Sequence, residues 1–228
     1  MMRADEIRVT LCNWISGWRF ENLTVMNKPN GCVVNGILHF DMEYNAIPIP
    51  DAYSMEIFWP NDYPKSLPIV TELSEKIPRH DDYHCSENGI LCLAIPTEMR
   101  ILIQKDTNIT FFINHFIVPF LYANSYRMKY GQYPWSTLPH RWDGVLEYFM
   151  DFFNFKDKQQ TLKFLKILYT NNRKNLKKHK YCPCGSGRKF YECHKKDYEK
   201  LRNYCTHKVF KKDLENMFGA MLKNFYKQ

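Results

Sequence analysis

Apolar residues near the start of the chain recur every three or four positions. They are Ile7, Leu11, Trp14, Ile15 and Trp18. Because an α-helix makes one turn in about 3.6 residues, this spacing places them on one face. We therefore predict an amphipathic helix that ends near Gly17, where the helical pattern stops.

The pattern changes to alternation between Asn22 and Leu73. The runs Cys32–Phe40 and Tyr53–Trp59 place apolar side chains at every second position, which predicts strands with one buried face. Turn residues at Asn30-Gly31 and in Pro48–Asp51 separate these runs. This part of the chain is predicted to form an antiparallel meander.

A long irregular segment, Pro64–Met99, follows the predicted meander. It contains four prolines together with Cys85 and Cys92. Loops of this length inside a compact domain are usually functional. Helical patterns follow at about Thr107–Tyr122, Asp143–Phe155 and Lys211–Tyr226. A meander with helices at both ends of the sequence predicts an α+β fold.

Charge is divided unevenly along the chain. Residues 1–150 contain 12 basic and 17 acidic side chains, whereas residues 151–228 contain 20 and 7. This shift predicts a mildly acidic body, a strongly basic tail and a boundary near residue 150. The hydrophobic content of 45% excludes a chain that is disordered throughout.

The N-terminal residues and the cysteines indicate the compartment. Met1–Ile15 carries charged residues before any apolar run, so no signal peptide is expected. The eight cysteines are then predicted to be reduced, with Cys12 and Cys32 in the core, and the protein to be cytoplasmic. The most apolar stretch, Ile109–Ala123, is shorter than the roughly 20 residues that cross a bilayer, so no membrane span is expected.

Four potential metal ligands lie within a short segment near the C-terminus. They are Cys182, Cys184, Cys193 and His194. Zinc takes four thiolate or imidazole ligands in a tetrahedron, and Gly185 and Gly187 permit the tight turn that this requires. We predict one structural zinc ion, because four protein ligands leave no position for water or substrate.

The segment Cys-Pro-Cys-Gly-Ser-Gly, followed by the Cys-His pair, resembles the SEC-C motif. This short zinc-binding element ends the SecA translocation ATPase and is appended to many bacterial proteins, so the resemblance implies a bacterial source. Gly-Ser-Gly-Arg-Lys lacks the spacing of a phosphate-binding P-loop, which makes that alternative weak. Cys205 and His207 are a further ligand pair that the complete site does not need.

Several motifs in the first part of the chain follow one another in a characteristic order. They are the Gly36–Phe40 strand, Tyr53–Pro60, Tyr63-Pro64 with Pro68, His84, Asn88–Leu93, Tyr133–Trp135 and Trp142–Tyr148. In this order they resemble the ubiquitin-conjugating enzyme family, and the last two resemble its bacterial members. The resemblance implies an N-terminal helix, a four-stranded antiparallel meander and C-terminal helices.

The two resemblances together imply three parts. Residues 1–155 are expected to form a ubiquitin-conjugating-like catalytic domain, and residues 156–180 a basic helical connector. Residues 181–228 are expected to form the SEC-C zinc-binding element and a terminal helix.

The family resemblance implies that Cys92 is the catalytic residue of a conjugating transferase. A thiolate is both a strong nucleophile and a good leaving group, so a cysteine can accept an acyl group as a thioester and pass it to a lysine. The implied partners are an activating enzyme and either a ubiquitin-like protein or the C-terminus of a cyclic-nucleotide synthase. Bacterial relatives of this kind often act in antiphage defence.

The chain departs from the eukaryotic family pattern before Cys92. The family's His-Pro-Asn is absent, and His84 is followed by Cys85 and Ser86. The missing asparagine is held to steady the loop or an oxyanion. His84, Asn88 or a main-chain amide is expected to replace it, whereas Cys85 is either a resolving thiol or an inert loop residue.

Two other functions remain open at the level of sequence. A binding module of the same fold without acyl chemistry is favoured by the missing asparagine and opposed by Cys92. The basic tail also suits an acidic protein or a nucleic acid. The aromatic residues that would stack bases are Phe190, Tyr191, Tyr198 and Tyr204.

Overall fold

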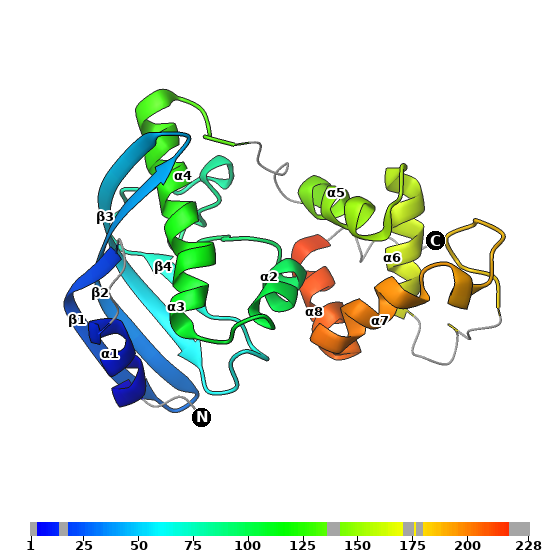
Figure 1. The fold of residues 1–228 in the computed structure, drawn as a ribbon, viewed down its shortest axis with the longest axis horizontal. Coiled ribbons are helices and arrows are strands. Elements are labelled where there is room, and N and C mark those ends of the chain that lie inside the picture. Colours follow the sequence, from blue (N-terminus) through cyan, green and yellow to red (C-terminus); the bar gives the residue numbers. More distant parts are fainter. Residues whose placement is uncertain (1–3, 14–17, 136–141, 171–175, 177–179, 219–228) are drawn as a thin grey trace. The chain divides into compact units, whose positions relative to one another are not determined.

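A computed structural model describes residues 4–13, 18–135, 142–170, 176 and 180–218. The chain forms two compact units, residues 1–137 and residues 138–228, which are described separately (Figure 1). The expected domain boundary at residue 155 falls inside the second unit.

The first unit is built on a four-stranded antiparallel sheet with the strand order β1-β2-β3-β4. The strands are β1 Trp18–Lys28, β2 Gly31–Tyr44, β3 Ile47–Pro60 and β4 Ile69–Glu72. Alternate side chains face the core. Val25, Val34, Ile57 and Val70 are successive cross-strand partners and form one buried row across all four strands. The predicted α+β class and the antiparallel meander are confirmed.

Helices cover the face of the sheet that carries this buried row (Figure 1). In the first unit they are α1 Ala4–Asn13, the short η1 Asp81–Tyr83, α2 Pro96–Ile103, α3 Ile109–Phe112, the π-helical η2 Ile113–Ile117 and α4 Val118–Tyr130. The Trp59 ring packs edge-on against Phe112, with 5.3 Å between centroids. The Tyr53 hydroxyl lies 2.6 Å from Ser125 Oγ, so buried contacts join β3 to both α3 and α4. Trp14 and Ile15 of the predicted first helix lie outside the described residues.

Two local predictions in this unit are wrong. Trp18 belongs to β1 and not to the first helix, and its indole N–H donates to Asn114. The chain turns at Asn45-Ala46, where both residues have positive φ, whereas Pro48–Asp51 lies within β3. Because β4 pairs only with Met55–Phe58, the start of β3 is an edge where proline removes no hydrogen bond of the ladder.

The second unit is helical and has a single core. Its helices are α5 Trp142–Phe153, α6 Lys158–Thr170, the short η3 Phe190–Glu192, α7 Lys195–Tyr204 and α8 His207–Phe218. Phe149 and Phe164, from α5 and α6, belong to the same buried cluster as Leu201, Phe210 and Cys182. The predicted connector therefore contains a core helix, α6, because its apolar face has the zinc-motif segment to pack against.

Candidate functional site

Cys92 ends a short hairpin that is attached to the edge of the sheet. The Leu91 N–H donates to the Val70 carbonyl, and the Glu72 N–H donates to the Gly89 carbonyl, both over 2.9 Å. These two bonds add the arm that leads to Cys92 as a further, very short strand beside β4. The hairpin therefore has a rigid support on one side.

The other arm of the hairpin carries His84. Its backbone is left-handed, with φ 51°, at the end of η1. The Cys92 N–H donates to the His84 carbonyl over 2.8 Å, and Cys85 and Leu91 form the next bridge of the ladder. The structure thus places the main chain of His84 opposite that of Cys92.

Asn88 lies at the exposed tip of the same hairpin. The turn closes where the Gly89 N–H donates to the Ser86 carbonyl over 2.9 Å. An extended arm advances about 3.3 Å per residue, so Asn88 and Cys92 lie at opposite ends of the arm. The structure brings His84, and not Asn88, beside Cys92.

The Cys92 side chain reaches the surface of the first unit. Enough protein nevertheless surrounds the sulfur that burial raises the pKa of the Cys92 thiol above its ordinary value. Burial disfavours the charged thiolate, so the neutral thiol predominates near neutral pH. Its reactivity then depends on how the proton is removed.

Alkylation of Cys92 by iodoacetamide is expected to keep rising with pH beyond the ordinary cysteine pKa. The thiolate is the reacting species, and a raised pKa shifts its formation to higher pH. Below that pKa, each pH unit should increase the rate about tenfold. Peptide mass spectrometry would measure the rate at Cys92 alone. A plateau below the ordinary cysteine pKa would contradict the raised value.

Arg127 and Tyr133 bind the segment that precedes His84. The Tyr133 hydroxyl donates to the Asp82 carbonyl over 2.8 Å, and the Arg127 guanidinium donates to the same oxygen. The guanidinium carbon lies 4.2 Å from the ring centroid of Tyr83 and 4.8 Å from that of Tyr133. Arg127 was not identified from the sequence, where it is only a basic residue near a predicted helix end.

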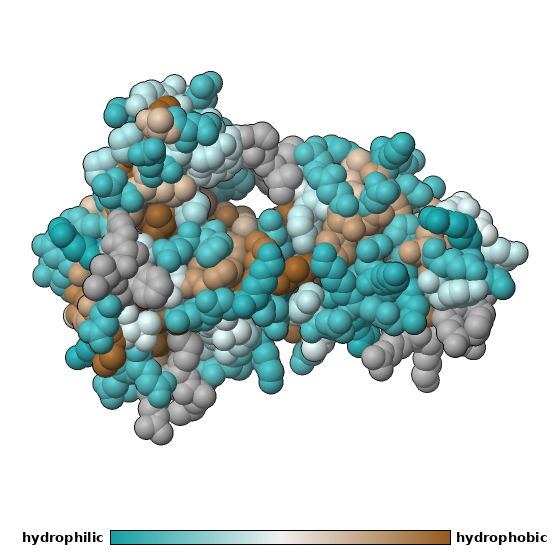
Figure 2. All heavy atoms as spheres, in the orientation of Figure 1, coloured by the Kyte–Doolittle hydropathy of each residue, from teal (hydrophilic) through white to brown (hydrophobic). Residues whose placement is uncertain are grey.

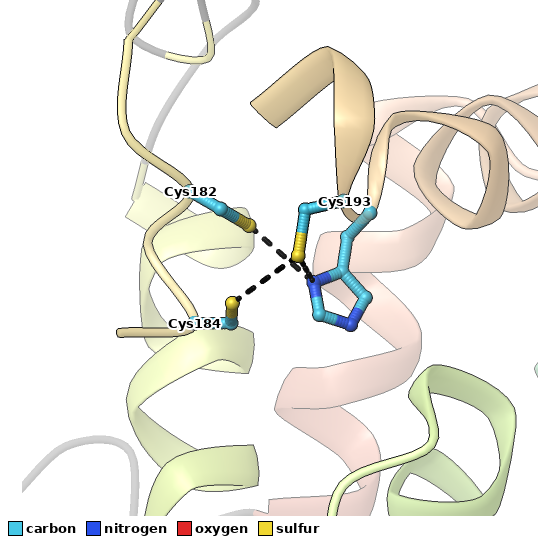
Figure 3. A group of neighbouring side chains, drawn as sticks. Cys182, Cys184 and Cys193 are labelled. Atoms are coloured by element: carbon cyan, nitrogen blue, oxygen red, sulfur yellow. Dashed lines mark hydrogen bonds between the residues drawn. The ribbon is translucent and has the colours of Figure 1, made fainter. Parts of the chain in front are cut away.

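The predicted metal ligands converge in the second unit. Their ligand atoms all lie within 4.8 Å of one another: Cys182, Cys184 and Cys193 Sγ and one His194 ring nitrogen. The three labelled cysteine side chains point toward one centre (Figure 3). Cys184 and Cys193 Sγ are 3.6 Å apart, close to the roughly 3.8 Å between sulfurs of a tetrahedral zinc site. The group can hold a metal ion and is compatible with zinc.

The orientation of His194 fits this role. Its Nδ1 lies 3.3 Å from Cys182 Sγ and 3.2 Å from Cys193 Sγ, whereas its Nε2 lies 2.9 Å from the Phe153 carbonyl. A carbonyl oxygen can only accept a hydrogen bond, so Nε2 carries the proton. Nδ1 therefore has a free lone pair to offer to a metal. The Phe155 ring packs against the imidazole with 4.8 Å between centroids. The last turn of α5 thus orients a ligand.

The thiols of the cluster differ in acidity. Burial raises the pKa of Cys182. Burial acts in the same direction on Cys184, but hydrogen bonds from the Ser186 hydroxyl and main-chain amide outweigh it and lower the pKa of Cys184 to about 6. Because a metal binds thiolates, Cys184 loses its proton to a metal more readily than Cys182 does.

Other residues singled out in the sequence lie outside both groups. Cys32 is buried as predicted, but Cys12 is exposed. Within the described ranges, Cys205 and His207 belong to no metal-ligating group, and His207 Nε2 lies 3.1 Å from the Leu168 carbonyl. Phe190 is buried in the second core, so it cannot stack on a base.

The surface of the second unit is strongly basic. Figure 2 shows hydrophilic side chains over much of its visible face. Exposed lysines on α7 and α8 include Lys196, Lys200, Lys208 and Lys212. No helix in the described part of the chain has the length and apolar content of a membrane span.

No protein-family model, curated protein or solved structure matches this chain.

Proposed function

We propose that the first unit is a ubiquitin-conjugating-like acyl carrier with Cys92 as its nucleophile. The observation that carries the proposal is the position of Cys92: an exposed thiol at the end of a hairpin that is hydrogen-bonded to the edge of an antiparallel meander. The motif order around it is the second support. An activating enzyme would supply the acyl group, a protein C-terminus of the ubiquitin-like or cyclic-nucleotide-synthase kind, in an antiphage defence system.

The proposed reaction has two steps. In the first, the Cys92 thiolate attacks the carbonyl carbon of an incoming thioester, a new C–S bond forms and the donor thiolate leaves. In the second, a lysine amine attacks the Cys92 thioester, loses a proton and releases the Cys92 thiolate. The raised pKa of Cys92 makes its thiolate a basic leaving group, so the second step benefits from groups that stabilise developing charge.

A synthetic peptide thioester ending in Gly-Gly tests this chemistry without an activating enzyme. We expect the intact protein to gain the peptide mass at Cys92 and to lose it on treatment with a thiol reductant or with free lysine. A wild-type protein that alkylates at Cys92 but never accepts the peptide, alone or with an activating enzyme, would contradict the proposal.

A non-catalytic binding module is the second candidate. It is favoured by the raised pKa of Cys92 and by the position of Asn88 at the far end of the hairpin. In that case Cys92→Ala should leave partner binding unchanged, whereas an acyl carrier loses the covalent adduct.

Removal of the His84 side chain is expected to slow discharge of the peptide to lysine by about 10²-fold, whereas Asn88→Ala is expected to have little effect. His84 lies opposite Cys92, and Asn88 serves as the matched position at the hairpin tip. Single-turnover mass spectrometry would measure both rates.

Because His84 has positive φ, His84→Gly must be compared with His84→Ala. Slow discharge in both would assign the effect to the imidazole, and recovery in His84→Gly would assign it to backbone strain. Equal slowing in Asn88→Ala would contradict the structural placement.

We also propose that Cys182, Cys184, Cys193 and His194 hold one structural zinc ion. Bound zinc would fix the four ligands and join the segment that contains them to α5 through His194. The supporting observations are the convergence of four ligand atoms and the carbonyl that fixes the His194 tautomer. Zinc would supply folding free energy and no reaction step, because all four positions are taken by protein ligands.

A further inference from the structure

Arg79 contacts two segments of the chain that support the hairpin of Cys92. Its Nη1 donates to Cys85 Sγ over 3.0 Å, and its Nη2 donates to the Glu72 carbonyl over 2.7 Å. Nη1 also lies 2.9 Å from the Glu72 carboxylate. One planar guanidinium therefore joins the end of β4 to the arm of the hairpin that carries His84.

The hairpin closes directly over this guanidinium. A side chain added at Gly89 would place its Cβ 3.0 Å from the Arg79 guanidinium and 2.4 Å from the Glu72 carbonyl. The Glu72 side chain is fully buried and the Arg79 side chain is 20% exposed. A buried charge is tolerated only beside a well-placed partner. The fork of N–H donors on the Arg79 guanidinium can serve the carboxylate and the carbonyl of Glu72 at the same time.

The contacts of Arg79 lead to Cys92 in two steps. The Cys85 sulfur accepts a hydrogen bond from Arg79, and Cys85 directly follows His84 in the chain. The His84 carbonyl in turn accepts the Cys92 N–H over 2.8 Å. We propose that Arg79 is a positioning residue that sets the place of Cys92 through Cys85 and the His84 carbonyl. This inference rests on the proposed acyl-carrier function. A displacement of about 1 Å at a reacting atom can lower a rate by about 10²-fold.

Arg79→Lys is the first test, because lysine keeps the charge beside Glu72 but lacks the fork. We expect transfer of the Gly-Gly peptide thioester to fall at least about tenfold. At pH 8, iodoacetamide should instead modify Cys92 faster, because a loosened hairpin admits water and returns the pKa toward its ordinary value. A residue with a merely structural role would not move these two rates in opposite directions.

Arg8→Lys is the matched control. Arg8 Nη2 also donates to a main-chain carbonyl of the sheet, that of Val25, over 3.1 Å, but in the contact between α1 and β1. Neither rate at Cys92 should change in this variant. An equal change would show that any loosened arginine produces the effect, and would overturn the inference.

The double variant Glu72→Met/Arg79→Met keeps the test decisive if Arg79→Lys folds poorly. It removes both charges and leaves no unpaired buried carboxylate, so the fold should be retained, as thermal melting would show. An unchanged alkylation profile of Cys92 in the folded variants would overturn the positioning role. A changed profile, with no peptide transfer even in the wild type, would instead overturn the acyl-carrier proposal alone.

Discussion

Replacement of Cys92 by alanine is expected to abolish the covalent adduct with a Gly-Gly peptide thioester. The thiolate supplies the electrons for the new C–S bond, and an alanine side chain has no lone pair to supply them in its place. Cys92→Ser should instead accumulate an ester that resists thiol reductants, when the acyl group is supplied by an activating enzyme. Intact mass spectrometry before and after reduction would distinguish these adducts.

Cys12→Ala provides the matched control, because Cys12 is also an exposed cysteine of the first unit. This variant should form the adduct at the wild-type rate. Adduct formation that persists in Cys92→Ala and disappears in Cys12→Ala would show that the nucleophile has been misassigned.

Loss of the metal ligands is expected to unfold the whole second unit. In Cys182→Ser/Cys184→Ser the zinc content should fall from about one ion per chain to near zero. A structural zinc supplies about 10 kcal/mol or more of apparent binding free energy. This is comparable to the whole free energy of unfolding of a unit of this size, so the unit should not stay folded without it. The loss should include α5 and α6, because they share one core with Cys182 and Cys184.

Hydrogen exchange would measure the extent of this unfolding along the chain. Protection should disappear from residue 142 onward, while the first unit and its Cys92 adduct remain. Cys205→Ser is the matched control, since Cys205 is buried in the same core but outside the ligand cluster. Protection that persisted in α5 and α6 after zinc loss would contradict the single core.

Strands of the first unit could be predicted where their own residues alternate between apolar and polar. The alternation in Cys32–Phe40 and Tyr53–Trp59 identified β2 and β3, although both strands extend further than the runs. The turn predicted at Pro48–Asp51 is wrong because proline is tolerated in a strand where its nitrogen faces an unpaired edge. Whether β3 has a second neighbouring strand at a given residue depends on β4, which comes later in the sequence.

The boundary between the units could not be predicted from charge. The shift near residue 150 is a property of the surface, whereas units are defined by their cores. Phe149 and Phe153 pack with Phe164 and Phe210, so α5 belongs to the second unit even though it continues the motifs of the first. The expected separate zinc element is for the same reason part of a larger core.

The sequence by itself indicated the four residues that could hold a metal ion and the cysteine of the candidate site. Cys182, Cys184, Cys193 and His194 lie within one short segment, and the identity of a soft ligand does not depend on distant residues. Only the tertiary structure decided that His84 and not Asn88 lies opposite Cys92, and that Arg79 and Arg127 hold the hairpin. Apart from the bond between Arg79 and the Cys85 sulfur, these contacts end on main-chain carbonyls, which every residue has and no sequence pattern records.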